Sequence, residues 1–214
     1  MSYTDIKNRI FHIIFFGGVM LFLTGIFIED HNLRMAGKPL PVIALLFMLK
    51  PDTPFRKNIF IAFVFSLIGD VLLEMSAGFF VFGLLSFLAA HLFFIMAFFR
   101  RKIEKAFFPA IMLSAFSAIY YLFLYPYLGD MAVPVFIYIS VITFMVWCAA
   151  AQRKFNSLAK YATLGALFFM LSDSLLAFTK FYHPISYSGY FTILTYWTAQ
   201  YLIFYSTQDI KQAS

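Results

Sequence analysis

The sequence predicts an all-α integral membrane protein, a polytopic helical bundle of eight transmembrane helices with both termini in the cytoplasm. Of the 214 residues, 63% are hydrophobic and 12% are charged, whereas soluble domains have about 45–50% apolar and about 25% charged residues. The apolar residues form runs of the length that a spanning helix needs, about 20 residues. Because these runs take up nearly the whole chain, we expect a single transmembrane domain over residues 1–214 and no separate soluble domain.

The apolar runs give the approximate limits of each span. The second run is the shortest, and Pro39 and Pro41 stand at its start, where a helix tolerates proline best. The third and fourth runs are separated by a very short turn near Ser76, so we expect them to form a helical hairpin. The predicted spans cover residues 10–28, 37–50, 57–76, 78–99, 106–125, 131–150, 158–179 and 187–207.

The basic residues determine the predicted orientation. With the N-terminus in the cytoplasm, only Arg34, Lys38 and Lys180 of the 16 Lys and Arg residues fall on the opposite side, as the positive-inside rule requires. Without the second span, the later basic loops would lie on the wrong side. The net charge of +6 therefore indicates topology and no nucleic-acid site. We expect a multi-pass protein, located in the inner (cell) membrane if the host is a bacterium.

Two aspartates inside predicted spans are the strongest functional signal. Residues 63–74 read FVFSLIGDVLLE and place Asp70 among apolar residues; residues 167–177 read LFFMLSDSLLA and do the same with Asp173. A carboxylate in hydrocarbon costs several kcal/mol or becomes protonated, so it usually has a function. Each lies 13 residues after a lysine at the cytoplasmic end of its span, roughly 20 Å into the membrane at 1.5 Å per residue.

The two carboxyl groups can therefore share one layer of the membrane. If their helices touch, such a pair favours one protonated and one ionised group, an acid beside a base. The alternative is that each aspartate hydrogen-bonds to neighbouring helices and only fixes their packing.

Further polar residues have a functional and a structural interpretation each. Glu74, one turn beyond Asp70, could join the site or be solvated at the outer boundary. His91, in the fourth span, could belong to a polar cluster or be a satisfied structural histidine. Lys38 could bind a phosphate or extend to the membrane surface as an ordinary boundary lysine.

The last span and the second Asp-bearing span add polar residues of their own. Thr192, Tyr196 and Gln200 recur every four residues and form a stripe that we expect to face the bundle, for substrate contact or for helix packing. Ser172 and Ser174 flank Asp173 and could hydrogen-bond to it.

Several other site types are excluded by the sequence. The four histidines are scattered, with no paired-His motif for zinc. Residues 67–70 read Leu-Ile-Gly-Asp, which departs from the Gly-x-Gly-Asp signature of intramembrane aspartyl proteases. The chain has neither a Gly-x-Ser-x-Gly elbow nor a P-loop.

Five short motifs in a fixed order resemble a known family. Over roughly residues 35–205, the chain resembles the lysoplasmalogenase family, the YhhN-like multi-pass membrane proteins. The matching motifs are Lys38-Pro39, Gly69-Asp70-Val71-Leu72-Leu73, Phe82-Gly83 to Ala90-His91, Ser172-Asp173-Ser174-Leu175-Leu176-Ala177, and Thr195-Tyr196 to Ala199-Gln200.

The resemblance implies eight helices and hydrolysis of the vinyl ether bond of lysoplasmalogen, a lysophospholipid substrate drawn from the membrane lipids. The products are a fatty aldehyde and glycerophosphoethanolamine or glycerophosphocholine. Protonation of the vinyl ether, followed by addition of water, calls for one acid and one carboxylate, and we assign these roles to Asp70 and Asp173 together. His91 and Tyr196 would orient them or the water, and Lys38 would hold the headgroup phosphate. No metal or organic cofactor is expected.

A small proton-coupled transporter or a lipid-binding membrane protein is the alternative. Buried aspartates on repeated helices also suit proton coupling. Against this interpretation, neither Asp-bearing span is broken by glycine or proline at mid-membrane depth. Turnover in detergent, where no gradient exists, would distinguish the two.

Overall fold

The computed structural model describes residues 3–104, 106–152 and 157–208. Over this part of the chain the backbone forms nine α-helices, two short 3₁₀ helices and one π-helical turn, and no strand. The predicted all-α class is confirmed for these residues. The chain divides into two compact units, Met1–Phe94 and Ile95–Ser214, and each is described by itself.

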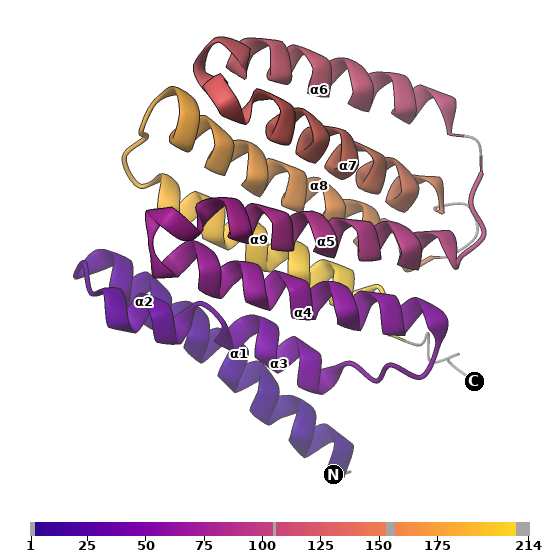
Figure 1. Cartoon of the computed structure of the whole chain (residues 1–214). Helices are drawn as coiled ribbons and strands as arrows, with labels where there is room; N and C mark the ends of the chain where they lie inside the picture. The colour runs from indigo at the N-terminus through magenta and orange to yellow at the C-terminus, as the bar shows by residue number, and fades with distance from the viewer. Residues whose placement is uncertain (1–2, 105, 153–156, 209–214) are drawn as a thin grey trace. The chain divides into compact units, whose positions relative to one another are not determined.

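The first unit contains α1 (Tyr3–Phe27), α2 (His31–Gly37), α3 (Leu40–Met48), α4 (Pro54–Met75) and the first part of α5 (Phe80–Phe99). The chain packs α2 and α3 against α1. The predicted hairpin is present: α4 and α5 run side by side and are joined through the short 3₁₀ helix Ala77–Phe79 (Figure 1).

The second predicted span differs most from the structure. Within residues 37–50 the structure has the short helix α3, and α2, just before it, is a helix that the sequence did not predict. Proline has no N–H to donate, so the chain restarts a helix at Pro39, the N-cap of α3. With nine residues, α3 rises about 14 Å, less than half of a hydrocarbon core about 30 Å thick.

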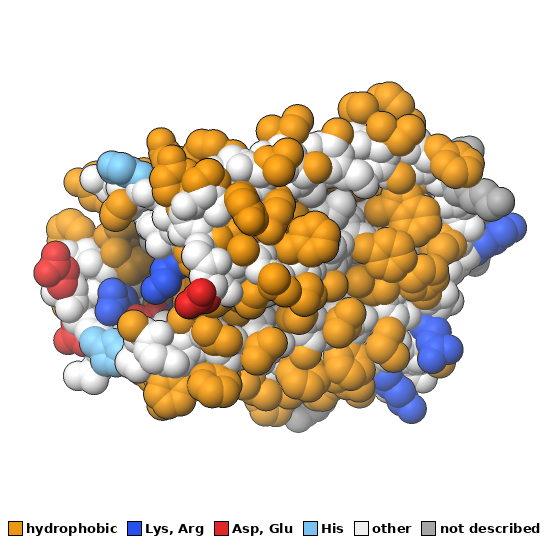
Figure 2. Space-filling model, turned by 45° about the horizontal axis from the view of Figure 1, so that its top comes forward, with side chains coloured by type: hydrophobic (Ala, Val, Ile, Leu, Met, Phe, Trp, Pro, Cys, Tyr) orange, Lys and Arg blue, Asp and Glu red, His pale blue; other side chains and the backbone are white. Residues whose placement is uncertain are grey.

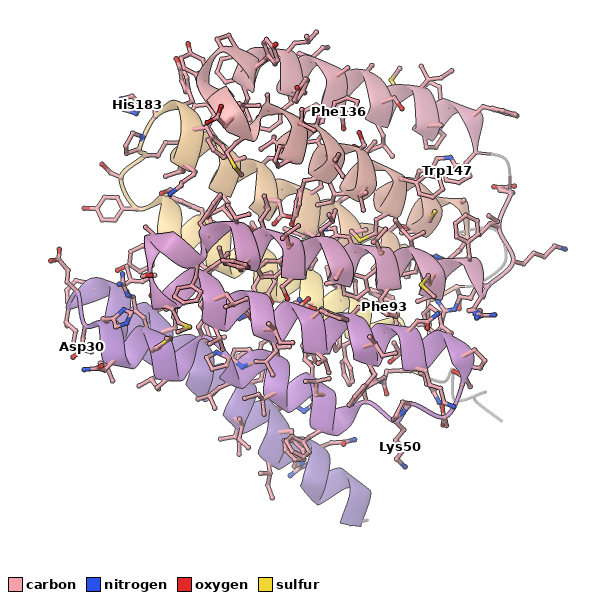
Figure 3. The ribbon with its side chains drawn as sticks, in the orientation of Figure 1. Asp30, Lys50, Phe93, Phe136, Trp147 and His183 are labelled. Atoms are coloured by element: carbon pink, nitrogen blue, oxygen red, sulfur yellow. The ribbon has the colours of Figure 1, made fainter. Side chains whose placement is uncertain are left out.

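Side chains determine where α2 and α4 begin. The Asp30 carboxylate accepts a hydrogen bond from the Leu33 N–H at 2.9 Å and caps α2 (Figure 3). The Thr53 hydroxyl accepts from the Arg56 N–H at 3.2 Å, and Pro54 follows at the first position of α4.

The second unit contains α6 (Phe107–Leu128), α7 (Ala132–Ala151), α8 (Ala159–Ala177) and α9 (Ser188–Tyr205). Consecutive helices pack against one another, and Figure 1 shows α6, α7 and α8 as antiparallel neighbours. Gly129, with φ of +51°, follows the end of α6 in a backbone conformation that other residues rarely adopt.

Five segments of the described chain are long and apolar enough to cross a membrane. The protein is therefore a multi-pass integral membrane protein. One segment, Phe107–Ala151, contains both α6 and α7, whereas α3 is too short and α9 carries too many Thr, Tyr and Gln residues to be included. The five segments are Asn8–Phe27, Pro54–Met75, Ala77–Phe99, Phe107–Ala151 and Ala159–Tyr182. The count of eight spans and the orientation of the termini stay predictions.

Large hydrophobic side chains are exposed on both units. Ile13 and Phe27 on α1 are 72% and 81% exposed, and Phe108 and Ile119 on α6 are 73% and 69% exposed. Hydrophobic side chains cover most of the face drawn in Figure 2. Such continuous apolar surface is typical of contact with lipid rather than with water.

Candidate active site

Asp70 lies inside the α4–α5 hairpin of the first unit. Its side chain is buried, as is that of Ser66 one turn earlier on α4. Gly69 directly precedes Asp70 on α4. A Cβ atom added at Gly69 would lie 2.7 Å from the Phe87 ring of α5. The two helices therefore come very close beside the buried Asp70.

His91 lies in the same hairpin, also fully buried. Its Nδ1 is hydrogen-bonded to the backbone carbonyl oxygen of Phe87, and because a carbonyl only accepts, Nδ1 carries a proton. The contacts of Gly69 with Phe87 and of Leu73 with Gly83 give the register of the hairpin. That register places His91 level with residues 65–66, about one helical turn from Asp70.

Glu74 lies between two cations at the C-terminal end of α4. Its Oε1 is 3.1 Å from Arg34 Nε, and its Oε2 accepts a hydrogen bond from Lys38 Nζ at 3.1 Å. The Lys38 and Glu74 side chains are only 12% and 11% exposed. Glu74 is therefore not a solvated boundary residue, and Lys38 does not extend freely to the surface. We refer to Arg34, Lys38 and Glu74 as the charged triad.

The sequence interpretation missed Arg34 as a member of this group. The available signal was its spacing: Arg34 precedes Lys38 by four residues, which places both side chains on one helical face. The predicted spans leave residues 29–36 in a loop, where a spacing of four carries no helical meaning. In the structure, residues 31–37 form α2 and Lys38 is its C-cap residue. The Arg34 and Lys38 side chains therefore both reach Glu74.

Asp173, in the second unit, has a partner that the sequence did not predict. The Tyr138 hydroxyl on α7 donates a hydrogen bond to Asp173 Oδ2 at 2.6 Å, and Tyr138 is buried. Nothing in the apolar run of α7 distinguished Tyr138 from its aromatic neighbours. The bond fixes one carboxylate oxygen of Asp173 on the α7 side of α8.

The serines beside Asp173 do not hydrogen-bond to it. Ser172 Oγ donates to the Thr192 carbonyl of α9 at 2.9 Å, and Ser174 Oγ donates to the Met170 carbonyl at 2.7 Å. The expected bonds to Asp173 are therefore absent: Ser174 donates to a carbonyl one turn earlier, as a hydroxyl inside a helix readily does, and Ser172 donates across to the neighbouring helix. Ser172 instead connects α8 to α9.

The polar stripe of α9 faces the interior. Tyr196 is buried, with its ring edge-on to Phe169 of α8 at 5.4 Å between centroids. Gln200, one turn later, is fully buried. The backbones of α8 and α9 come very close here, since a Cβ on Gly165 would be 2.8 Å from the Ala199 carbonyl oxygen.

Several buried polar atoms lack a hydrogen-bond partner within the described ranges. Among them are the Ser66 hydroxyl, one turn from Asp70, and both amide atoms of Gln200, one turn from Tyr196. An unsatisfied buried polar group costs about 1–3 kcal/mol and needs an explanation. A water molecule or a polar ligand group beside each of the two residues would supply the hydrogen bonds that Ser66 and Gln200 lack.

An apolar groove runs between α6 and α7 in the second unit. Its volume is about 700 Å³, and its walls include Leu113, Tyr121, Phe136 and Trp147; Figure 3 labels the last two on α7. The Ser117 and Thr143 hydroxyls in the wall are hydrogen-bonded to each other at 2.6 Å. Because its walls are mainly apolar, the groove suits a hydrocarbon chain.

No metal site is evident among the described residues, where no group of three or more His, Cys, Asp or Glu side chains converges.

The predicted site residues are divided between the two units. The first unit brings Lys38 together with Glu74 and places Asp70 near His91, and the second contains Tyr196, Gln200 and Asp173. The pairing of Asp70 with Asp173 stays a prediction from the sequence.

Comparison with known proteins identifies relatives over most of the chain. The model of the YhhN family matches residues 33–207. Human lysoplasmalogenase TMEM86A is 35% identical over 191 residues, which cover 82% of this chain and 78% of the relative. Human lysoplasmalogenase TMEM86B is 32% identical over 171 residues, which cover 78% of this chain and 71% of the relative. No solved structure matches.

Proposed function

Because the chain belongs to the YhhN family, we propose that it is a membrane-embedded hydrolase that cleaves the vinyl ether bond of lysoplasmalogens. The products are a fatty aldehyde and glycerophosphoethanolamine or glycerophosphocholine. The observation that carries this proposal is the similarity to human lysoplasmalogenase TMEM86A across 82% of the chain. The buried Asp70 and the hydrogen-bonded Asp173 support it, because the reaction needs carboxyl groups in a site of low polarity.

The chemistry proceeds through an oxocarbenium ion. A carboxylic acid protonates the β-carbon of the vinyl ether, and the positive charge is shared by the α-carbon and the ether oxygen. Water adds to the α-carbon and gives its proton to a carboxylate. The hemiacetal then collapses, which breaks the bond between the α-carbon and the glycerol oxygen. The glycerol oxygen takes the proton from the carboxyl group that accepted it from water, and the hemiacetal hydroxyl gives its proton to the other carboxylate, which regenerates the acid and releases the aldehyde. Asp70 and Asp173 take the acid and base roles.

The other predicted site residues, and Ser66 from the structure, have supporting roles in this proposal. Ser66 and Gln200 bind the water or the substrate, which supplies the hydrogen bonds that their buried groups lack in the described chain. His91 and Tyr196 orient the reacting groups. Lys38 holds the headgroup phosphate, with Glu74 beside it. The groove between α6 and α7 is large enough for a single alkenyl chain.

The finer topology belongs to the same proposal. Eight spans with both termini in the cytoplasm place Lys38 on the outer side and both aspartates in one layer of the membrane. In a bacterial host the protein would lie in the cell membrane, with lysophospholipid supplied by the surrounding lipids.

The test is aldehyde release from a lysoplasmalogen by the purified full-length protein in detergent, with a chelator present. We expect the wild type to release aldehyde, and we expect Asp70→Asn and Asp173→Asn each to lose at least about 100-fold in kcat, as is typical for loss of a general acid or base. Asp130→Asn, at an exposed residue in the turn between α6 and α7, is the matched control and should keep wild-type activity.

Thermal unfolding of each variant separates lost chemistry from lost folding. A well-folded wild type that releases no aldehyde would overturn the proposed function. A fully active Asp70→Asn or Asp173→Asn would overturn the assigned pair of carboxyl groups, even if the hydrolase activity itself is found.

A further inference from the structure

The charged triad has an unusual balance of charge for a group that is largely buried. A single carboxylate, Glu74, is shared by two cations, so the triad carries one uncompensated positive charge. Lys38 and Glu74 are about nine-tenths buried, whereas Arg34 is 36% exposed. An excess charge this close to hydrocarbon is costly unless an anion compensates it.

Donors for such an anion remain available. The Lys38 ammonium has three N–H groups and uses one on Glu74; the Arg34 guanidinium has five and is paired with Glu74 through Nε. Guanidinium and ammonium groups together are a suitable pair for a phosphate. The described structure thus offers a phosphate site on the side of the two cations that faces away from Glu74.

A phosphate alone would not match the triad. It would bring a second negative charge toward Glu74 and compete for the same two cations. A zwitterionic phosphodiester avoids this conflict, because its ammonium group supplies a cation for the carboxylate. The triad has the complementary set of charges, two cations for the phosphate and one anion for the amine.

An aromatic ring completes the surroundings. The Phe22 ring of α1 lies beside Lys38, with Nζ 5.8 Å from the ring centroid. Aromatic faces attract ammonium groups, including quaternary ones. An ethanolamine or a choline group placed between Glu74 and Phe22 would find both an opposite charge and a ring.

The distance to Asp70 agrees with a lysophospholipid. Glu74 follows Asp70 by one turn of α4, a rise of about 6 Å at 1.5 Å per residue. Five covalent bonds separate the phosphorus from the vinyl ether oxygen in a lysoplasmalogen, and their extended length is similar. A headgroup held by the triad would therefore bring the scissile bond to the level of Asp70.

From these contacts we infer that Arg34, Lys38 and Glu74 bind the zwitterionic headgroup of the lysophospholipid, with Glu74 selecting amine-bearing headgroups over anionic ones. This inference rests on the proposed function for its substrate and adds the headgroup specificity. Arg34 and Lys38 bind the phosphate of any lysophospholipid, and Glu74 distinguishes the headgroups.

The experiment compares two substrates that differ only beyond the phosphate. One is an alkenyl glycerophosphocholine, and the other is the alkenyl glycerophosphoglycerol with the same chain, which carries no amine. We expect the wild type to prefer the choline substrate. In Glu74→Gln, kcat/KM for the choline substrate should fall about tenfold, the effect of one charged hydrogen bond, and kcat/KM for the glycerol substrate should hold or rise. Arg34→Gln and Lys38→Gln should lower kcat/KM for both.

Matched controls guard against indirect effects. Glu74→Asp keeps the carboxylate and should retain the preference for the choline substrate. It replaces Glu74→Gln as the test if that variant folds poorly. Asp52→Asn removes the exposed carboxylate that pairs with Arg56 at the other end of α4, and it should leave both substrates unchanged. Equal losses on both substrates in Glu74→Gln, or no loss on either, would overturn the inference.

A binding measurement separates this inference from the proposed function. Lysophosphatidylcholine and lysophosphatidylglycerol have an ester in place of the vinyl ether, and their binding is followed by the shift in thermal unfolding of the purified protein. If the wild type releases no aldehyde from either alkenyl substrate, the proposed function fails, and stronger binding of lysophosphatidylcholine that depends on Glu74 still supports the headgroup site. Equal binding of the two lipids overturns the inferred headgroup site. So does a shift in thermal unfolding with inorganic phosphate alone that equals the shift with lysophosphatidylcholine.

Discussion

At the scale of the residue, the sequence identified two carboxyl groups inside apolar helices but not the side chains that hold them. Asp70, Asp173, Lys38 and Gln200 stood out because each is a polar residue in an apolar context. The Tyr138 partner of Asp173 did not stand out, because one tyrosine in an aromatic-rich helix carries no pattern. Hydrogen bonds between helices depend on packing, which local sequence does not encode.

The hydrogen bond from Tyr138 to Asp173 leads to the first prediction. Tyr138→Phe removes only the hydroxyl, so Asp173 loses a charged hydrogen bond of 2.6 Å and kcat should fall about tenfold with KM little changed. Steady-state aldehyde release measures both constants. Tyr121→Phe, which removes a longer bond of 3.3 Å to the Ala132 carbonyl, should have a small effect. A Tyr138→Phe variant with raised KM and unchanged kcat would contradict this positioning role.

The unsatisfied amide of Gln200 leads to the second prediction. Gln200→Leu replaces a buried polar group that has no partner in the described chain with an apolar one of similar size. The unfolding midpoint should hold or rise, because the desolvation cost of the amide is removed, while aldehyde release falls. Parallel loss of stability and activity would show instead that Gln200 is a packing residue. Differential scanning of the purified variants gives the comparison.

At the scale of the element, hydropathy located the helices well. Each predicted span overlaps a helix of the structure, because apolar runs of this length can satisfy their backbone groups only as helices. The region 29–50 is the exception, since α2 and α3 are short and are divided at Lys38 and Pro39. The side chains that begin α2, Asp30 above all, are a local signal that a span-length search does not use.

The close contact of α8 and α9 leads to a prediction about stability. A Cβ on Gly165 would lie 2.8 Å from the Ala199 carbonyl oxygen, a backbone atom that cannot move aside. Gly165→Ala should therefore lower the free energy of unfolding, by about 1–3 kcal/mol as overpacking commonly does. Gly17→Ala is the matched control, since nothing lies within 4 Å of its Cβ position, and it should stabilise α1 by up to about 1 kcal/mol. The same sign for both variants would contradict this explanation.

At the scale of the whole molecule, composition predicted a membrane protein and the helices of both units agree with it. Fewer segments pass the test of length and apolarity than the eight apolar runs predicted, because α3 is short, α9 carries many Thr, Tyr and Gln residues, and α6 and α7 fall in a single segment. The division at Phe94 and Ile95 falls inside α5, so no linker composition marks it. Which carboxyl groups act together is decided by packing between helices far apart in the sequence.

The orientation of the chain can be measured with single cysteines. Cys148 is buried, and Cys148→Ala gives a background without thiols. In that background, Tyr187→Cys, at a residue 75% exposed, should react with a membrane-impermeant maleimide on intact cells. Asp52→Cys, predicted to be cytoplasmic, should react only after permeabilisation. The opposite pattern would invert the topology, and labelling of both on intact cells would contradict the odd number of spans predicted between them.

The groove that we propose for the alkenyl chain, between α6 and α7, has a consequence for how the enzyme meets its substrate. Its wall includes Phe136, a side chain 54% exposed on the apolar surface, so a lipid would arrive by lateral diffusion within a membrane rather than from water. The rate would then depend on the mole fraction of lysoplasmalogen in the micelle or bilayer. Adding neutral detergent at constant bulk substrate would slow the reaction by surface dilution, and the enzyme would respond to the composition of its membrane.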